Sequence, residues 1–305
     1  MSRASCRSRA SLVLIALAMS LSRAYAQSSP PSRTRVIMLG TGSPRADPDR
    51  FGPATVIQVD SIAYLIDAGV GVVRRWAAAR QAGATTLAPW DLRTLFITHL
   101  HSDHTLGYAD LILSTWTLDP GPRRPLRVFG PSGTSAMTSH LLAAYEEDIR
   151  IRTGARGELA GVAPPRVDVV ELAPGVVYRD SLVTVTAFAV HHGTFPQAFG
   201  FRFQTPDRDI VISGDAAPPS TIPAQCHGCD ILIHEGGFVH RDSTNAYGRE
   251  FHTSMEDLID VARAARPKLL VLYHQTRGDN EAGRKFIQAG FGGRVVVARD
   301  LDIFR

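Results

Sequence analysis

One short segment constrains this chain more than any other: three histidines and an aspartate occur within six positions, directly after an apolar run. The run Leu95–Thr98 indicates a buried strand, and the residues after it spell His-x-His-x-Asp-His. Residues two apart in an extended segment point to the same side, so His99 and His101 are expected to share a face. A turn after them would bring Asp103 and His104 back to a second, nearby point. This one loop could therefore serve two metal ions.

Two further candidate ligands also follow apolar runs that are typical of strands. Asp215 comes after Ile210–Ser213, and His274 comes after Leu269–Leu272. Taken alone, Asp215 could cap a turn or a helix, and His274 could be a core residue. Ligand-type groups at three strand ends favour one shared metal site, and zinc accepts imidazole and carboxylate ligands.

The rest of the chain predicts a layered α/β arrangement. Strands are expected at residues 35–39, 55–59, 63–66, 95–98, 126–129, 167–172, 182–190, 199–204, 209–212, 230–234 and 269–272. Helices are expected at residues 71–81, 108–117, 134–149, 255–265 and 284–290. This order of strands and helices favours two sheets with helices outside them.

The N-terminus predicts a secretory signal peptide. Three arginines precede the apolar stretch Ser11–Leu21, and Ala24–Ala26 has the small-x-small pattern of a cleavage site. The stretch is too short for a membrane anchor, because spanning a bilayer takes about 20 apolar residues. We therefore expect a periplasmic or secreted protein with no membrane anchor after cleavage. Its expected parts are a signal peptide at 1–26, a flexible leader at 27–33 and one domain at 34–305.

The charge balance argues against a polyanionic partner. The chain has 33 basic and 29 acidic residues, a formal net charge of +4. Without the four arginines of the expected signal peptide, 29 basic and 29 acidic residues remain. A neutral body lacks the overall positive field that attracts nucleic acid.

The pair Cys226 and Cys229, spaced C-x-x-C, leaves three interpretations open. A zinc site needs about four ligands, and the chain has no second cysteine pair. A thioredoxin-like redox site should open a helix after a strand, whereas Cys229 precedes an expected strand. We favour the third interpretation, a loop disulfide or two thiols without a role, because exported proteins can keep such bonds.

The His-x-His-x-Asp-His segment after a strand resembles the metallo-β-lactamase superfamily, and the resemblance covers most of residues 34–305. It is carried by an ordered set of motifs at Leu39–Ser43, Leu65–Gly69, Ser213–Asp215, Ile233–Glu235, His252–Ser254 and Leu272–His274. The set is most similar to the ribonuclease Z and aryl-sulfatase-like branch. This resemblance implies an αββα sandwich, in which two mixed sheets carry helices on their outer faces and a two-metal site lies at one edge.

The resemblance also implies two zinc ions per chain, with a hydroxide between them. The implied ligands are His99, His101 and His192 for the first ion, Asp103, His104 and His274 for the second, and Asp215 for both. His191 is an alternative to the adjacent His192. The spacing to Pro196 and to Phe199–Arg202 matches His192 better.

His252 is the candidate proton donor, and the resemblance places it beside the leaving group. It stands just before Ser254, a candidate N-cap for the helix that begins near Met255. Glu235 could fix its tautomer and raise its pKa. We count Asp103 with these two as catalytic. A capping or surface role for His252 and a buried structural pair of His234 and Glu235 remain alternatives, and Asp67 is expected to orient the metal loop.

The implied activity is hydrolysis of a small anionic ester, a phosphodiester or a sulfate ester. Alternatives are a lactone or other ester, tRNA 3′ processing as in ribonuclease Z, and a metal-binding module without turnover. The family places a tRNA-gripping arm between the third histidine ligand and the bridging aspartate. From His192 to Asp215 there are only 23 positions, which two expected strands and a turn fill. We therefore expect no nucleic-acid partner, and a homodimer stays open.

Overall fold

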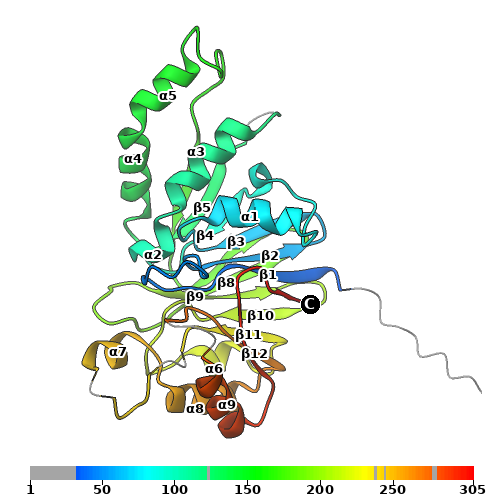
Figure 1. The fold of residues 1–305 in the computed structure, drawn as a ribbon, viewed down its shortest axis with the longest axis vertical. Coiled ribbons are helices and arrows are strands. Elements are labelled where there is room, and N and C mark those ends of the chain that lie inside the picture. Colours follow the sequence, from blue (N-terminus) through cyan, green and yellow to red (C-terminus); the bar gives the residue numbers. More distant parts are fainter. Residues whose placement is uncertain (1–31, 122–123, 237–238, 244, 277–279) are drawn as a thin grey trace, which may run out of the picture. The chain divides into compact units, whose positions relative to one another are not determined.

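The computed structural model describes residues 32–121, 124–236, 239–243, 245–276 and 280–305. The expected signal peptide and most of the expected leader lie outside the described residues. In the part that is described, two mixed sheets face each other and helices cover their outer faces (Figure 1). This arrangement confirms the predicted αββα sandwich.

The first sheet combines an antiparallel half with a parallel half. Its order is β14-β1-β2-β3-β4-β5-β6, and β3 to β6 pair in parallel. The predicted hairpin at its centre is present, because β2 and β3 pair antiparallel around Asp60. The strands are β1 Thr34–Gly40, β2 Ala54–Val59, β3 Ile62–Ile66, β4 Thr94–Phe96, β5 Leu126–Gly130, β6 Val167–Glu171 and β14 Ile303–Phe304.

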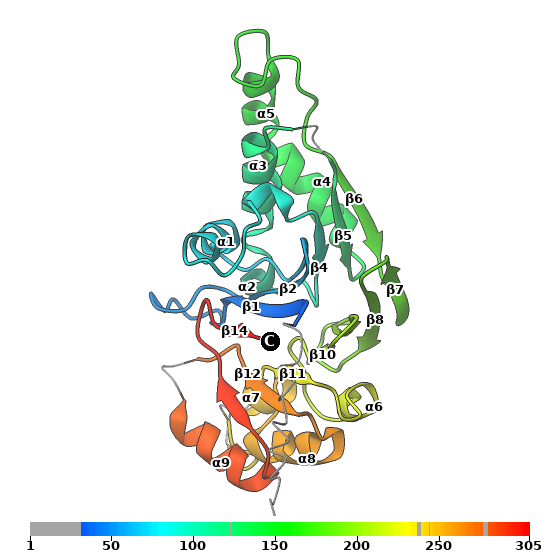
Figure 2. The same cartoon turned by 90° about the vertical axis from the view of Figure 1, so that its right-hand side faces the viewer.

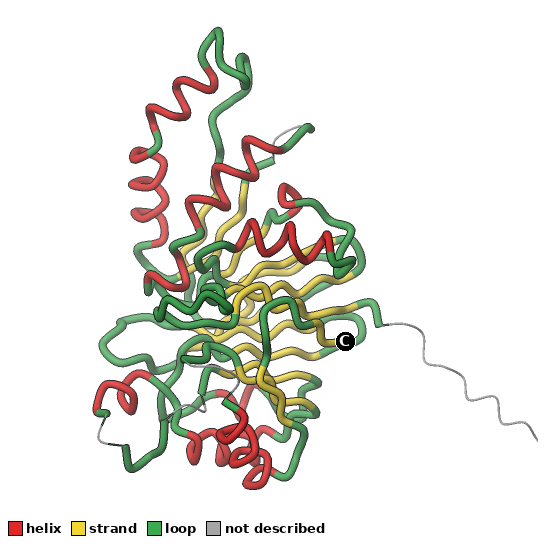
Figure 3. Tube along the Cα trace, viewed as in Figure 1, coloured by secondary structure: helices red, strands yellow, loops and turns green. Residues whose placement is uncertain are grey.

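The second sheet has the same mixed character. Its order is β13-β12-β11-β10-β9-β8-β7, and β10 to β13 pair in parallel. The strands are β7 Gly175–Arg179, β8 Thr184–Ala189, β9 Phe199–Gln204, β10 Asp209–Ile212, β11 Ile231–His234, β12 Leu269–Leu272 and β13 Val295–Val297. Figure 3 shows the strands of both sheets between the helices.

The helices divide between the two sheets. Those that accompany the first half of the chain are α1 Val72–Gln81, α2 Ser102–Thr105, α3 Tyr108–Leu118, α4 Thr134–Ala144 and α5 Glu146–Thr153, with a 3₁₀ turn at Pro89–Asp91. Those of the second half are α6 Ile222–Gln225, α7 Ala246–Phe251, α8 Met255–Ala265 and α9 Glu281–Phe291. None of the helices in the described residues is long and apolar enough to cross a membrane.

Three buried apolar layers hold the sandwich together. The central layer lies between the sheets, where Phe96 packs against Phe201 and Phe203 at ring-centroid distances of 5.5 and 5.4 Å. A second layer joins the first sheet to α1 and α3 around Trp76, which is fully buried. The third joins the other sheet to α6, α8 and α9 around Leu258. This packing fixes the strand ends on which the site is built.

One expectation about secondary structure was wrong. The helix expected at 134–149 is two helices, because Tyr145 leaves the helical region with φ −106° and ψ 15°. Figure 2 shows α4 alongside the edge of the first sheet, with α5 continuing beyond it. The strands β7, β13 and β14 were not expected, and β7 is a mostly exposed edge strand that lacks the apolar alternation of a half-buried strand.

Candidate metal centre and proton donor

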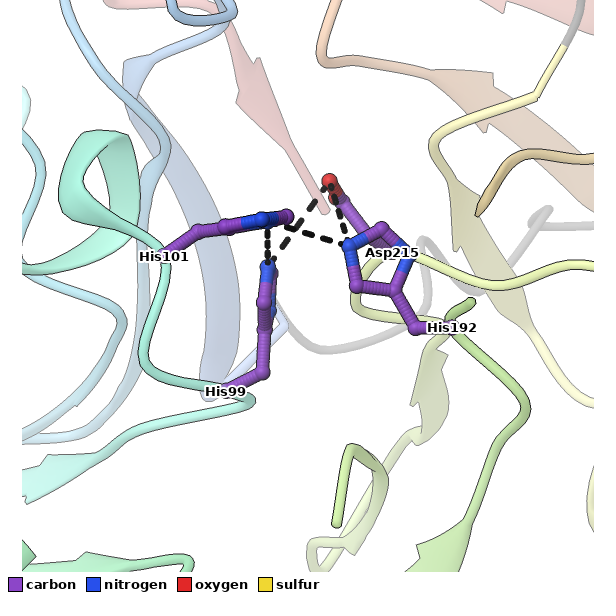
Figure 4. A group of neighbouring side chains, drawn as sticks. All are labelled: His99, His101, His192 and Asp215. Atoms are coloured by element: carbon purple, nitrogen blue, oxygen red, sulfur yellow. Dashed lines mark hydrogen bonds and ion pairs between the residues drawn. The ribbon is translucent and has the colours of Figure 1, made fainter. Parts of the chain in front are cut away.

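One group of candidate ligands comes from both sheets. His99 and His101 follow β4, His192 follows β8 and Asp215 follows β10. Figure 4 shows the four side chains converging on one point. Nδ1 of His101 lies 2.9 Å from Nε2 of His99 and 3.1 Å from Nε2 of His192. His191, the alternative to His192, is exposed.

A second group lies beside the first. The turn expected after His101 is the short helix α2, and it places Asp103 and His104 in the site. Nε2 of His274 lies 3.1 Å from Oδ2 of Asp103, and Nε2 of His104 lies 3.5 Å from the same oxygen. All three residues are buried. The structure thus brings together every residue that the resemblance implied as a ligand.

Asp215 lies between the two groups. Its Oδ1 is 3.4 Å from Nε2 of His104, and its Oδ2 is 3.2 Å from Nε2 of His274. Oδ2 is also 4.0 Å from Nε2 of both His99 and His192. A carboxylate in this position can contact two cations at once, as in two-metal hydrolases.

The donor atoms fit divalent metal ions. Nitrogens bound to one tetrahedral zinc ion, each about 2.0–2.1 Å from it, lie roughly 3.3 Å apart, close to the spacing in the His99 group. Nε2 of His104 and Oδ1 of Asp215 are buried and have no hydrogen-bond partner among the described residues. Buried polar atoms without a partner are rare and costly, and a cation between them removes that cost. This set of histidines and aspartates is a metal-binding cluster.

The electrostatics of the cluster also suit a cation. Burial lowers the pKa of His99 well below its usual range, which keeps the imidazole in the neutral form that binds metals. Burial opposes the ionisation of Asp215, but His274 and His104 outweigh it and hold its pKa well below the usual range. Burial likewise opposes protonation of His104, yet Asp215 and Asp67 raise its pKa well above normal. The carboxylates of Asp215 and Asp67 thus favour a positive charge at this point of the cluster.

Asp67 holds the loop in place, as the sequence analysis expected. Its Oδ1 accepts a hydrogen bond from the backbone N–H of Thr98 at 2.8 Å, and its Oδ2 lies 2.8 Å from Nδ1 of His104. The second contact fixes the tautomer of His104 and directs Nε2 to the site. Asp67 and His274 both have left-handed backbones, with φ 57° and 58°. Such conformations cost about 1–3 kcal/mol each and cluster at functional sites.

His252 lies next to the cluster and contacts a buried carboxylate. Its Nδ1 is 3.0 Å from Oε2 of Glu235, which also accepts the backbone N–H of Thr253 through Oε1. Ser254 caps α8 as expected, because its hydroxyl accepts the N–H of Asp257. Burial opposes protonation of His252, but the charge and the hydrogen bond of Glu235 raise its pKa to about 9. The raised pKa favours the protonated imidazole, which could donate a proton.

A pocket of about 440 Å³ opens at the cluster. Asp103, Asp215, His252 and His274 line it. Several other residues that line it were not expected from the sequence, namely Ser43, Arg45, Asn245, Tyr247 and Thr276. No periodicity pointed to α7, which is only one and a half turns long. The Cys226–Cys229 pair forms a disulfide after α6 and does not line this pocket.

Comparison with known proteins agrees with the fold and the cluster. The model of the beta-lactamase superfamily domain matches residues 63–275. A protein named ribonuclease Z from Mycobacterium sp. (strain KMS) is 34% identical over 246 residues, which are 78% of this chain and 83% of that protein. Another of that name, from Mycobacterium bovis (strain BCG / Pasteur 1173P2), is 30% identical over 281 residues, 87% of this chain and 96% of that one.

Solved structures show the same architecture at low sequence identity. The metallo-beta-lactamase fold protein YhfI from Bacillus subtilis superposes with a TM-score of 0.69 at 15% identity, over 89% of this chain and 99% of that one. The short form of human tRNase Z superposes with a TM-score of 0.66 at 22% identity, over 89% and 98%. Together with the matched family model and the ribonuclease Z relatives, the cluster at the sheet edge leads to one conclusion: this chain belongs to the metallo-β-lactamase superfamily of hydrolases, in the branch that contains ribonuclease Z.

Proposed function

We propose that this chain is a two-zinc phosphodiesterase. One observation carries the proposal: Asp215 lies within 4.0 Å of histidines from both groups of candidate ligands, so that two cations would stand side by side at the pocket. His99, His101 and His192 would hold one zinc ion, Asp103, His104 and His274 the other, and Asp215 both. Bound zinc ions would supply Lewis acidity toward the phosphoryl oxygens and activate water.

The protein's own groups would handle the leaving group. His252, whose pKa Glu235 raises, would give a proton to the departing oxygen. Glu235 would hold the imidazole with Nε2 directed toward the pocket. Asp67 would hold His104 and the metal-binding loop in position. In this proposal Asp103, His252 and Glu235 keep the catalytic roles expected from the sequence.

A phosphodiester is favoured over a sulfate ester or a lactone by the relatives. The name ribonuclease states that those proteins act on RNA, whose backbone is a phosphodiester. Their names also favour an RNA substrate, whereas the neutral charge of the chain after the expected signal peptide argued against one. We keep cleavage at the 3′ side of tRNA as the second candidate function. Against it stands the segment from His192 to Asp215, which β9, β10 and short connections occupy without an arm.

A substrate panel on the zinc-loaded protein tests the proposal. We expect turnover of bis(p-nitrophenyl) phosphate, with a much lower kcat/KM on p-nitrophenyl sulfate and on an aryl-substituted lactone. The sulfate and the phosphodiester have the same leaving group. A difference in kcat/KM between them therefore comes from the phosphorus or sulfur centre. A 3′-extended tRNA precursor forms the last arm of the panel. Faster turnover of the sulfate or the lactone would overturn the proposal, and efficient trimming of the precursor would make RNA the substrate.

We also propose that the protein is exported. The support is the sequence of residues 1–26, which lie outside the described residues. Expression of the full-length chain in a Gram-negative host, followed by fractionation and N-terminal sequencing, tests this proposal. We expect periplasmic protein that begins at Gln27. Full-length protein confined to the cytoplasm would contradict it.

A further inference from the structure

The pocket at the metal cluster extends past the candidate ligands to residues that no step described above uses. Arg45 lies in the loop after β1, and Tyr247 lies in α7. Both line the same pocket as His252 and Asp215. Residues in this position could contact the part of a substrate that extends away from the reacting centre.

Tyr247 is an exposed aromatic ring with a fixed position. It is 55% exposed, and its ring stacks on Phe251, one helical turn later, at a centroid distance of 4.3 Å and an angle of 16°. Phe251 is itself held, because its carbonyl lies 2.7 Å from Nδ1 of His192 and its ring lies against Gly193. A candidate ligand thus anchors the ring beneath Tyr247. A second aromatic group could stack on Tyr247 at little entropic cost.

The ring also lies beside His252, the proposed proton donor. Its centroid is 6.3 Å from that of His252, at an interplanar angle of 61°. A group stacked on Tyr247 would therefore be adjacent to the imidazole that meets the departing oxygen. This geometry favours an aromatic alcohol, or a nucleoside with its base on the tyrosine, as the leaving group.

Polar donors at the same pocket favour a negatively charged substrate. Arg45 is exposed, and no carboxylate of the described residues lies within ion-pair distance of its guanidinium. Ser43 is 7% exposed, and its hydroxyl has no hydrogen-bond partner among the described residues. An arginine and a hydroxyl next to a metal site can bind the non-bridging oxygens of a phosphate.

We propose that Tyr247 and Arg45 form a recognition site that selects phosphodiesters with an aromatic leaving group. Tyr247 supplies the stacking surface for the ring, and Arg45 with Ser43 supplies donors to the anion. This inference rests on the proposed phosphodiesterase function. It predicts that binding, and not only turnover, distinguishes aromatic from aliphatic ligands.

Calorimetric titration of the zinc-loaded full chain with phenylphosphonate and methylphosphonate tests the inference. The two probes carry the same charged group and differ in the ring, and neither is hydrolysed. We expect phenylphosphonate to bind roughly 5- to 50-fold more tightly, the range that one stacked aromatic group provides. Tyr247→Ala should remove that preference, and Tyr247→Phe should keep it. Arg45→Ala should weaken both probes by a similar factor.

Tyr145→Ala provides the matched control, because Tyr145 is also an exposed tyrosine, 42% accessible, but lies between α4 and α5 and does not line this pocket. It should leave both affinities unchanged. A preference that persists in Tyr247→Ala at full zinc content, or no binding of phenylphosphonate to the wild type, would overturn the inference. If the protein binds phenylphosphonate through Tyr247 but hydrolyses no phosphodiester, the proposed function fails and the recognition site stands.

Discussion

Replacement of Asp215 by alanine should abolish hydrolysis and release zinc. The carboxylate is 2% exposed, and its two oxygens face His104 and His274 at 3.4 and 3.2 Å. Removing a ligand shared by two cations weakens both sites and separates the ions that would act together. Since metal ions supply several kcal/mol to such reactions, we expect kcat/KM to fall by more than about 10³-fold. Elemental analysis of zinc per chain, run beside the activity assay, measures both effects.

Two further variants make this result specific. Asp215→Asn keeps the shape of the side chain but removes its charge, so it should also lose zinc while preserving the fold. Asp168→Ala removes an exposed aspartate of β6 whose one ion pair within the described part of the chain is with Arg166, and it should change neither zinc content nor rate. If Asp215→Ala kept its zinc and its activity, the bridging role would have to be abandoned.

Replacement of His252 by alanine should slow the reaction and leave both zinc ions in place. A positioned general acid contributes roughly 10²–10⁴-fold, so we expect kcat to fall by that factor. The loss should be largest on a phosphodiester with a poor leaving group such as phenol. It should shrink on bis(p-nitrophenyl) phosphate, because nitrophenolate departs without a proton. Equal losses on both substrates would argue for a positioning role instead.

The zinc content of the His252→Ala variant shows whether His252 is a metal ligand or a proton donor. His252 lies close enough to Asp215 and His274 for the three to hold a metal ion together. Loss of one zinc ion from His252→Ala would therefore place the imidazole among the ligands. Retention of both ions, with slow turnover, would leave it as the proton donor.

Glu235→Gln gives the pH signature of the same group. Burial opposes the charged imidazole, and Glu235 raises its pKa to about 9. The acid form is present below that pH and is lost as the pH rises through it. Without the carboxylate charge the pKa falls, so the alkaline limb of kcat should move to lower pH in the variant. An unchanged limb would show that another group titrates there.

Spacing and strand ends were enough to predict much of the site from the sequence. His99 and His101 share a face because they alternate along an extended segment, and this follows from local geometry. Asp215 and His274 each follow an apolar strand, and parallel strands end at the same edge of a sheet. The His-x-His-x-Asp-His segment then identified the fold. These features depend on residues that are close together in the sequence.

The missed features depend on contacts between distant segments. Tyr247 reaches the pocket because Phe251 packs against the loop at His192. No motif near residue 247 in the sequence indicates this contact. The hydroxyl of Ser43 became a candidate only when the structure showed it buried without a partner. The break at Tyr145 was missed because the run 134–149 has good helix formers on both sides of it.

The candidate ligands come from both sheets of the sandwich, so bound metal ions would also affect the stability of the folded protein. His99, His101, Asp103 and His104 follow β4 of one sheet, while His192, Asp215 and His274 follow strands of the other. Ions held between them would link the two sheets, which also pack against each other through the apolar core. A cation present at about 100 times its dissociation constant adds about 2.7 kcal/mol to the free energy of unfolding. The metal supply of the compartment where the chain matures would then govern its lifetime as well as its chemistry, and starvation for zinc would expose it to proteases.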